Sequence, residues 1–380
     1  MKSVQDIPIL ENVPVFVRAS LNVPIENGKV ANAYRLKHAL PTIQFLQKSH
    51  ARVVIGSHIG EAGTETLEPV YQALKEMLSD VTFCPVSTGP IAREAVRTLS
   101  PGGVLVLENL RRHRGEVMND PAFAHELAEL ADVFVEDAFD TCHRAHASIV
   151  TLPTLLPSYA GLQLLEEITQ LSKALSPKSP SLAVIGGAKF GTKEPVIRRL
   201  LSLYTHVFVG GALANDFLQA GGHSVGKSLV SGTDTDVIKE LLKDAKLALP
   251  VDSLVCAFDG TKKPEDARVA SLDDVKENET MLDHGPKTIE EIAGLVTGAK
   301  TILWNGPLGE YELGFIEATD ALASAIASSG AESYIGGGDT EAAIESLHLN
   351  NRFTFISTGG GAMLDFLAKG TLPGIQALES

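Results

Sequence analysis

Residues 181–193, SLAVIGGAKFGTK, join a short apolar run to a pair of glycines and then to the start of a helix. Residues 182–185 are all apolar, which predicts a strand that is buried on both faces. The run ends at Gly186 and Gly187, and the pattern that follows predicts a helix over residues 192–203. A strand, a glycine turn and a helix in this order are typical of the units that build a parallel sheet.

Two lysines flank the start of this helix, because Lys189 falls in the turn and Lys193 in the first helical turn. Unpaired backbone N–H groups and the helix dipole favour an anion there, and glycine lets a phosphate group approach the backbone. Taken alone, the stretch leaves two interpretations open, a phosphate site and a tight turn with two solvated lysines. It contains neither GxGxxG nor GxxxxGK[ST], the two motifs that would decide between them.

The same pattern recurs in the second half of the chain. Four further apolar runs are each followed by glycine within three residues: 206–209, 301–304, 333–335 and 353–356. In an open parallel sheet such turns meet at the carboxyl edge, where these folds bind ligands. Two of the turns contain three consecutive glycines, residues 336–338 and 359–361, and precede helices expected from residues 341 and 362. This favours a polyphosphate ligand, with five purely structural turns as the alternative.

The composition is that of a globular protein with two domains. The chain has 380 residues, of which 44% are hydrophobic and 21% charged. Acidic residues outnumber basic residues 47 to 32, so the formal net charge is −15. We therefore expect no nucleic-acid partner, and an anionic substrate would need a local basic pocket. The three cysteines are widely separated, and no apolar run could span a bilayer or act as a secretory signal, so we expect a cytoplasmic protein without membrane association.

The first half also alternates strands and helices, which predicts a second α/β domain. Strands are expected at residues 13–18, 52–56, 104–108 and 133–135, and helices at residues 34–48, 67–78, 91–99 and 121–130. Prolines then bracket a helix expected over residues 159–175, which we interpret as a hinge helix. The predicted fold is α/β, with two doubly wound, Rossmann-like parallel-sheet domains over residues 1–158 and 176–370.

Polar and basic residues follow the strands of the first domain. Arg18, Ser20 and Asn22 follow the first strand, and Arg35 begins the first helix. Further along are SHIG at residues 57–60, ENLRRHR at 108–114 and DAFDTCHRAH at 137–146. Guanidinium groups suit carboxylates and phosphates, so this edge predicts a pocket for a small molecule with two anionic groups. Surface arginines paired with nearby acids are the alternative for any single one of them.

Taken together, these motifs resemble the phosphoglycerate kinase family. The resemblance covers nearly the whole chain through VRASLNVP, RLKHALPTI, SHIG, ENLRRH, DAFDTCHRAHAS, GGAKFGTK, WNGPLGEYE, GGGDT and STGGGAMLDFL, which follow in the family's order. It implies reversible transfer of a phosphoryl group between ATP and the carboxylate of 3-phosphoglycerate, which gives 1,3-bisphosphoglycerate and ADP. The N-terminal domain would bind the glycerate and the C-terminal domain the magnesium nucleotide. The tail, residues 371–380, would pack back on the N-terminal domain.

The resemblance also assigns roles to residues. It implies that the glycerate is bound by Ser20, Asn22, Arg35, His58, Gly60, Arg111 and Arg144. Lys189 and Lys193 would hold the transferred phosphoryl group and the nucleotide phosphates, Glu312 the ribose and Asp339 the Mg²⁺ ion. Phosphates would also be bound by Thr340 and the backbone of Gly336, Gly337, Gly338, Gly360 and Gly361. Arg35, Lys189, Gly337 and Gly360 would be the catalytic residues.

The chemistry needs few specialised groups. A carboxylate nucleophile is ionised near neutral pH, so no general base is required. Phosphoryl transfer then depends on alignment and on positive charge around the transferred oxygens. Because the two substrates would bind different domains, domain closure would have to bring them together and exclude water.

Several residues depart from the family's pattern. Ser20 stands where the family has aspartate and Glu61 where it has arginine, while Glu136 and Asp140 stand where it often has asparagine and glycine. We expect Glu61 to turn away from the substrate or to pair with an arginine, with Arg112 or Arg114 supplying the missing charge.

Two other functional classes share parts of this pattern. A nicotinamide dehydrogenase would carry GxGxxG after a strand, and the chain has no such motif. A homologue that binds nucleotide without turnover, or that uses a changed acceptor, is the alternative raised by Ser20 and Glu61. The expected partners are therefore small molecules, ATP or ADP and the glycerate, and the expected oligomeric state is a monomer.

Overall fold

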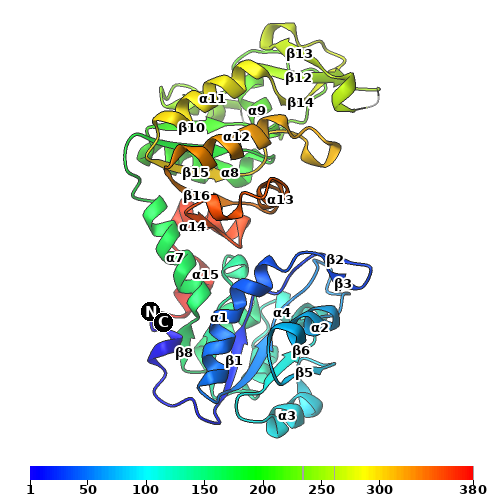
Figure 1. Cartoon of the computed structure of the whole chain (residues 1–380), viewed down its shortest axis with the longest axis vertical. Helices are drawn as coiled ribbons and strands as arrows, with labels where there is room; N and C mark the ends of the chain where they lie inside the picture. The colour runs from blue at the N-terminus through cyan, green and yellow to red at the C-terminus, as the bar shows by residue number, and fades with distance from the viewer. Residues whose placement is uncertain (233–234, 261, 380) are drawn as a thin grey trace. The chain divides into compact units, whose positions relative to one another are not determined.

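The computed structural model describes residues 1–232, 235–260 and 262–379, and the chain divides into two compact units. Unit 1 comprises Met1–Thr169 and the segment from Thr371 onward, and unit 2 comprises Gln170–Gly370. Both ends of the chain therefore belong to unit 1 (Figure 1). Within the described residues, no helix is both long and apolar enough to cross a bilayer.

Unit 1 is built on a six-stranded sheet in which every neighbouring pair is parallel. Its strand order is β5-β6-β4-β1-β7-β8. The strands are β1 (Pro14–Arg18), β4 (Arg52–Gly56), β5 (Val81–Cys84), β6 (Val104–Leu107), β7 (Val133–Glu136) and β8 (Ser158–Ala160). All five residues of β1 are buried, as expected for a central strand with both faces covered.

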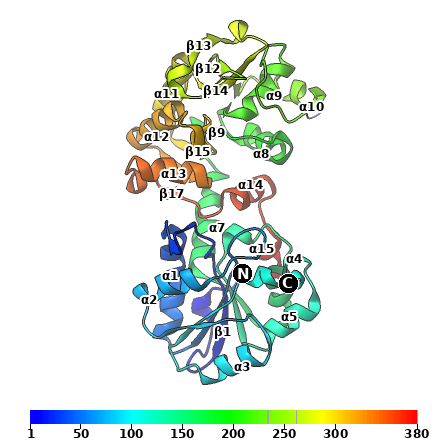
Figure 2. The same ribbon diagram turned by 90° about the vertical axis from the view of Figure 1, so that its right-hand side faces the viewer.

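Helices cover both faces of this sheet because alternate strand residues point to opposite sides. Val15 and Val17 pack in one core with α1 (Tyr34–Lys48) and α2 (Glu68–Met77). Phe16 packs in the other core with α3 (Gly89–Thr98) and α5 (Pro121–Ala128). Figure 2 shows α1 and α2 on one side of the sheet and α5 on the other. Unit 1 is thus doubly wound, as the sequence predicts.

Short elements complete unit 1. They are η1 (Val4–Asp6), β2 (Ile25–Glu26), β3 (Lys29–Val30), η2 (Leu110–Arg112), α4 (Arg114–Val117), η3 (Phe139–Thr141), η4 (Ala147–Thr151, a π-helix) and α6 (Leu152–Leu155). Near the C-terminus, α15 (Pro373–Ala377) packs against η4, and the Gly374 N–H donates to the Cys142 carbonyl at 2.9 Å. Ser380, the last residue of the predicted tail, lies outside the described residues.

Unit 2 repeats the parallel architecture with the strand order β11-β10-β9-β15-β16-β17. The strands are β9 (Ser181–Ile185), β10 (His206–Val209), β11 (Leu247–Ala248), β15 (Thr301–Asn305), β16 (Glu332–Gly336) and β17 (Phe355–Ile356). Every residue of β9 and β15 is buried, so both faces of the central strands are covered. The helices are α8 (Phe190–Leu203), α9 (Ala212–Ala220), α10 (Thr235–Leu241), α11 (Pro286–Gly298), α12 (Glu317–Ser329), α13 (Gly338–Ser346) and α14 (Gly360–Lys369).

Unit 2 also contains a small antiparallel sheet that the sequence pattern does not predict. It has the order β13-β12-β14 and lies beside α11 (Figure 1). Its strands are β12 (Asp252–Ala257), β13 (Arg268–Ser271) and β14 (Glu279–His284). The short 3-10 turns η5 (Pro264–Asp266), η6 (Leu272–Asp274), η7 (Tyr311–Leu313) and η8 (Asn350–Arg352) complete unit 2.

Several predicted helix starts are wrong. Helices α3 and α8 begin at Gly89 and Phe190, two residues before their predicted starts at residues 91 and 192. The connecting helix α7 spans Leu162–Ala174, because Tyr159 and Ala160 belong to β8 and pair with β7. The helices predicted from residues 341 and 362 begin earlier, at Gly338 and Gly360. In both cases glycines form the first turn, where helix propensity alone does not predict a helix.

Asp137, directly after β7, holds the N-terminus of α7. Its Oδ1 accepts hydrogen bonds from the N–H groups of Gln163 at 2.9 Å and Leu164 at 3.2 Å. The side chain is 1% exposed, and burial raises its pKa to about 7. The folded protein therefore keeps a proton that the unfolded chain releases at much lower pH.

We predict that Asp137 makes stability fall as pH rises from about 4 to about 7, with no further change above that range. Replacing it by asparagine keeps the acceptor oxygen and removes the titration. In Asp137→Asn the unfolding free energy should therefore change less steeply with pH in this range, by the equivalent of up to one bound proton. The measurement is the midpoint of urea unfolding, followed by circular dichroism, from pH 4.5 to 8. Asp132→Asn, at an exposed position, is the control. An unchanged slope in Asp137→Asn would contradict the prediction.

Candidate functional site

Each unit carries one cluster of candidate functional residues at the carboxyl edge of its parallel sheet. In unit 2 the edge is formed by the turns after β9, β10, β15, β16 and β17, the five glycine turns noted in the sequence. In unit 1 the edge carries the arginines, His58 and their neighbours.

The first three glycine turns of unit 2 lie backbone against backbone. A Cβ on Gly211 would lie 2.6 Å from the Gly187 nitrogen, and one on Gly306 would lie 2.7 Å from the Gly186 carbonyl carbon. Gly306 also has a φ of +94°, which side chains rarely adopt. Glycine is therefore required for these turns to approach one another.

The two triple-glycine turns pack against each other in the same way. A Cβ on Gly360 would lie 2.6 Å from the Cα of Gly337, which has a φ of +110°. In α13 the Glu341 N–H is bonded to the Gly337 carbonyl, so the N–H groups of the preceding turn have no intrahelical acceptor. The N-termini of α13 and α14 thus lie side by side, with Gly336, Gly338 and Gly361 in the same turns.

A cavity of about 280 Å³ opens beside these turns. A second cavity of about 450 Å³ shares Ala188, Ala212 and Leu229 with the first and continues to Lys189. The first cavity is lined by Gly187, Ala188, Gly211, Ala212, Asn215, Leu229, Ser253, Met281, Leu282, Asp283, His284, Pro307, Leu308, Gly309, Glu310, Tyr311, Glu312 and Asp339. Of these, only Glu312 and Asp339 are assigned a role by the family resemblance.

Lys193 lies in the first turn of α8 and is 9% exposed. Its Nζ donates a hydrogen bond to the Gly186 carbonyl in the turn after β9. Burial lowers the pKa of Lys193 to about 8, and the nearby Asp339 carboxylate offsets part of that effect. Lys193 is therefore a positive charge held inside the glycine-lined edge.

Lys189 occupies the N-cap position of α8 with a φ of +66°. The adjacent Phe190 N–H donates to the Ser231 hydroxyl at 3.0 Å, and that hydroxyl donates to Asp216 at 2.9 Å. These bonds hold the turn in a conformation that is rare for residues other than glycine, and strain of this kind is common at functional sites. The exposed Lys189 side chain leaves the turn at the start of the helix.

Asp339 and Thr340 belong to the first turn of α13 but differ in what they offer a ligand. Asp339 is exposed and lines the cavity. Thr340 is fully buried, and its hydroxyl accepts the Gly306 N–H at 3.1 Å. This bond ties the first turn of α13 to the turn after β15. Glu312, in η7, is also exposed and lines the same cavity.

This arrangement suits a nucleotide polyphosphate. Helix N-termini, two lysines and bare glycine backbone are groups that bind phosphate oxygens. Among the described residues, no three His, Cys, Asp or Glu side chains cluster to hold a metal ion. A lone Asp339 carboxylate fits Mg²⁺, which is usually bound through one or two carboxylates together with substrate phosphates.

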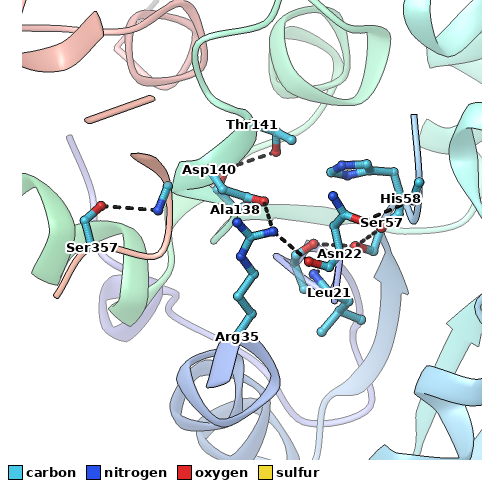
Figure 3. Close-up of polar contacts among 12 residues, drawn as sticks. Leu21, Asn22, Arg35, Ser57, His58, Ala138, Asp140, Thr141 and Ser357 are labelled. Atoms are coloured by element: carbon cyan, nitrogen blue, oxygen red, sulfur yellow. Dashed lines mark hydrogen bonds and ion pairs between the residues drawn. The ribbon is translucent and has the colours of Figure 1, made fainter. Parts of the chain in front are cut away.

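In unit 1, Arg35 and Asn22 lie next to each other at the carboxyl end of β1. One Arg35 Nη donates to the Asn22 carbonyl at 2.6 Å and lies 3.7 Å from an Asp140 carboxylate oxygen. Figure 3 shows Arg35, Asn22 and His58 pointing toward the same region. The Asn22 side-chain oxygen accepts the Gly60 N–H at 3.0 Å, which joins the turns after β1 and β4.

Arg111 and Arg144 extend the basic edge. Arg111 is 9% exposed, and it donates to the Gly60 carbonyl at 2.8 Å, while its Nε has no partner among the described residues. Burial and the neighbouring Arg144 and Arg18 lower the Arg111 pKa. Gly60 has a φ of +69°, so a glycine suits this turn.

The departures from the family pattern have clear structural environments. Ser20 is 3% exposed, and its hydroxyl has no partner among the described residues. The Glu61 side chain is 89% exposed and lies 3.9 Å from Arg144, so it both turns outward and pairs with an arginine. Arg112 is held by Glu108 at 2.9 Å, which leaves it poorly placed to replace the missing charge.

Burial governs the ionisation of several groups at this edge. His58 is 2% exposed, and burial followed by the charges of Arg18, Arg111, Arg35 and His146 lowers its pKa well below 6.5. The pKa of His146 falls to about 4 for the same reasons, burial first. Both rings are therefore neutral near pH 7. Burial also raises the pKa of Glu136 well above its usual value.

Comparisons with known proteins agree with this picture. The family model for phosphoglycerate kinase matches residues 4–370. The phosphoglycerate kinase of Moorella thermoacetica is 42% identical, with 97% of both chains covered. That of Pelotomaculum thermopropionicum is 41% identical, with 99% of this chain and 98% of the relative covered.

Two solved structures are also similar. The phosphoglycerate kinase of Pyrococcus horikoshii has a TM-score of 0.88 and 31% identity over 100% of this chain and 98% of its own. That of Coxiella burnetii has a TM-score of 0.83 and 39% identity over 99% and 98%.

We predict that ADP affinity falls as pH rises through about 8, because Lys193 then loses the charge that attracts phosphate. Titration calorimetry from pH 6.5 to 9.5 should show a loss of up to about tenfold per pH unit above that point. Lys193→Arg keeps its charge in this range and should remove the inflection. Lys189→Met, at the exposed neighbouring lysine, should weaken ADP binding but leave the inflection in its pH dependence unchanged. An inflection that persists in Lys193→Arg would contradict the assignment.

Proposed function

The chain belongs to the phosphoglycerate kinase family, and on that premise we propose how its two strand-edge sites share the reaction. The protein is a kinase that transfers a phosphoryl group reversibly between ATP and the carboxylate of 3-phosphoglycerate, giving 1,3-bisphosphoglycerate and ADP. The relatives are kinases, which does not favour the alternative of a homologue that binds nucleotide without turnover. What we propose is the assignment of substrates to sites and of roles to residues.

We assign the nucleotide to the cavity of unit 2, and the packing of two glycine-rich helix N-termini beside Lys193 carries this assignment. The N–H groups of Gly337, Gly338, Gly360 and Gly361 bind phosphate oxygens. Glu312 binds the ribose hydroxyls across the cavity. The apolar part of the lining, with Leu229, Leu282 and Leu308, accommodates the base.

The family normally uses a magnesium nucleotide, and we propose that Asp339 holds the ion together with the nucleotide phosphates. When bound, Mg²⁺ neutralises phosphate charge and orients the oxygens for transfer. Asp339 suits this role because it is exposed on the first turn of α13.

We assign 3-phosphoglycerate to the basic edge of unit 1. Arg111, Arg144 and His58 bind its phosphate, while Arg35, Asn22 and Ser20 bind its carboxylate and hydroxyl. The unsatisfied Ser20 hydroxyl and Arg111 Nε support this assignment, because buried polar groups normally have hydrogen-bond partners. The loss of a carboxylate at position 20 leaves a neutral hydroxyl that still accepts and donates hydrogen bonds.

The mechanism follows from the charges of these residues. The acceptor carboxylate is ionised near pH 7 and attacks the terminal phosphoryl group without a general base. Arg35 and Lys189 stabilise the charge on the transferred group, with the glycine-rich helix N-termini. Because each unit holds one substrate, we propose that the units close around both to align them and exclude water. The buried free cysteines Cys84, Cys142 and Cys256 accord with a cytoplasmic enzyme.

Lys189→Ala tests the catalytic assignment. In a coupled assay of ADP formation from ATP, 3-phosphoglycerate and magnesium, we expect kcat to fall about 100-fold or more, because the lysine acts mainly on transition-state charge. Both KM values should change far less than kcat. Lys239→Ala, an exposed lysine in α10, is the matched control. Raised KM values with an intact kcat would remove Lys189 from the transfer step.

Glu61→Gln tests the acceptor site. Removing a carboxylate that lies 3.9 Å from Arg144 should lower the KM for 3-phosphoglycerate. Because the pair is exposed, we expect an effect of about two- to fivefold that disappears at high salt. The KM for ATP should not change, and Glu68→Gln, at an exposed position in α2, is the control. An unchanged acceptor KM at low salt would place Glu61 outside the field of the substrate.

A further inference from the structure

A network of buried, hydrogen-bonded side chains contacts His58, and the mechanism above assigns no role to it. Arg18 ends β1, Glu116 belongs to α4 and Ser148 belongs to the π-helix η4. All three side chains are 0% exposed. Burying charged groups is costly unless they are paired, so their contacts with one another require an explanation.

The proton positions in this network follow from the donor and acceptor capacity of each group. Glu116 accepts the Ser148 N–H at 2.9 Å and the Ser148 hydroxyl proton at 2.6 Å. The only proton of that hydroxyl is therefore used. The Ser148 oxygen can then only accept, and it accepts from Arg18 Nε at 3.0 Å.

Arg18 passes this constraint to His58. One of its terminal nitrogens donates to the Ala19 carbonyl at 2.9 Å, and the other lies 3.2 Å from His58 Nδ1. A guanidinium group has donors and no acceptor, so Nδ1 must be the acceptor of this bond. A neutral imidazole that accepts at Nδ1 carries its proton on Nε2. No hydrogen bond within the described residues occupies Nε2.

We propose that Glu116, Ser148 and Arg18 are positioning residues that fix His58 as the Nε2–H tautomer, so that it presents one N–H donor of set direction to an anionic oxygen of the acceptor substrate. The tautomer follows from the contacts of this chain of residues. Its use in binding rests on the proposed assignment of 3-phosphoglycerate to unit 1.

The surroundings of His58 support a neutral ring. Arg18, Arg111 and Arg35 face it with positive charge, and His146 is the neighbouring titratable ring. His146 in turn lies 3.9 Å from Glu116. A proton on Nδ1 would point at the Arg18 guanidinium, so the contact itself opposes the imidazolium form. A neutral donor adds direction to phosphate recognition without adding a further charge to a crowded basic edge.

The first test needs neither substrate nor variant. In protein labelled with ¹⁵N in the histidine rings, the two nitrogens of His58 should show the chemical shifts of a neutral ring with a proton on Nε2, unchanged from pH 6 to 8. The His58→Gln spectrum identifies the signals among the 11 histidines. A proton on Nδ1, or a charged ring in this range, would overturn the proposal.

The second test asks whether Glu116, Ser148 and Arg18 position the His58 ring. Ser148→Ala removes the acceptor of Arg18 Nε, and Glu116→Gln replaces one acceptor oxygen with a donor. Each should shift the His58 signals toward a mixture of tautomers and raise the KM for 3-phosphoglycerate about three- to tenfold, while the KM for ATP stays the same. Ser49→Ala, which removes a hydroxyl bonded to the Phe45 carbonyl in α1, is the control. Unchanged His58 signals in both variants would show that these residues do not fix the tautomer of the ring.

The third test separates the tautomer from the assigned substrate. The glutamine amide nitrogen lies close to the place of Nε2, and the asparagine amide close to that of Nδ1. His58→Asn should therefore raise the KM for 3-phosphoglycerate about tenfold more than His58→Gln does. Equal losses would overturn the role of Nε2. If the NMR signals show the Nε2–H tautomer and neither variant changes this KM, the assignment of 3-phosphoglycerate to this edge is wrong instead.

Discussion

Both sites depend on one constraint, the common direction of all strands in each six-stranded sheet. Because the strands are parallel, every strand ends at the same edge and the helices that follow begin there. The constraint is the same in both units, but the chain meets it with different residues. Unit 2 places glycines and two lysines at this edge, and unit 1 places arginines and a histidine. One architecture thereby provides the two sites to which we assign a polyphosphate and a small dianion.

The close approach of the glycine turns in unit 2 has to be held in place. Trp304, the only tryptophan, is fully buried, and its indole N–H donates to the Gly306 carbonyl at 2.9 Å. Thr340 accepts the Gly306 N–H from the other side. Gly306 is thus fixed at both its polar groups by side chains from β15 and α13. Gly306 is therefore held rigidly, because both its N–H and its carbonyl are hydrogen-bonded to neighbouring side chains.

The sequence predicted the parallel sheets and the glycine turns that follow their strands, because buried strands and glycine turns are local patterns. The antiparallel sheet β12–β14 was missed because buried polar residues, among them Asp252, Ser253 and Asp283, interrupt the apolar runs of its strands. The role of His284, which accepts the Gly211 N–H at 3.0 Å, was also missed, since 73 residues separate them. Ser148 carried no signal either, because its partners become visible only when β1, α4 and η4 come together in the fold.

The basic edge of unit 1 carries several acids where the family pattern has other residues, although the protein already has a net charge of −15. Glu136 adds an acid next to Arg18, but burial raises its pKa, and one of its oxygens accepts the Ala138 N–H at 2.9 Å. Asp140 lies 3.7 Å from Arg35, so its charge is paired. Glu61 points into water, where screening weakens its field. Each added acid is therefore neutralised, paired or screened, and this explains how the pocket tolerates residues that its sequence pattern alone would make unfavourable.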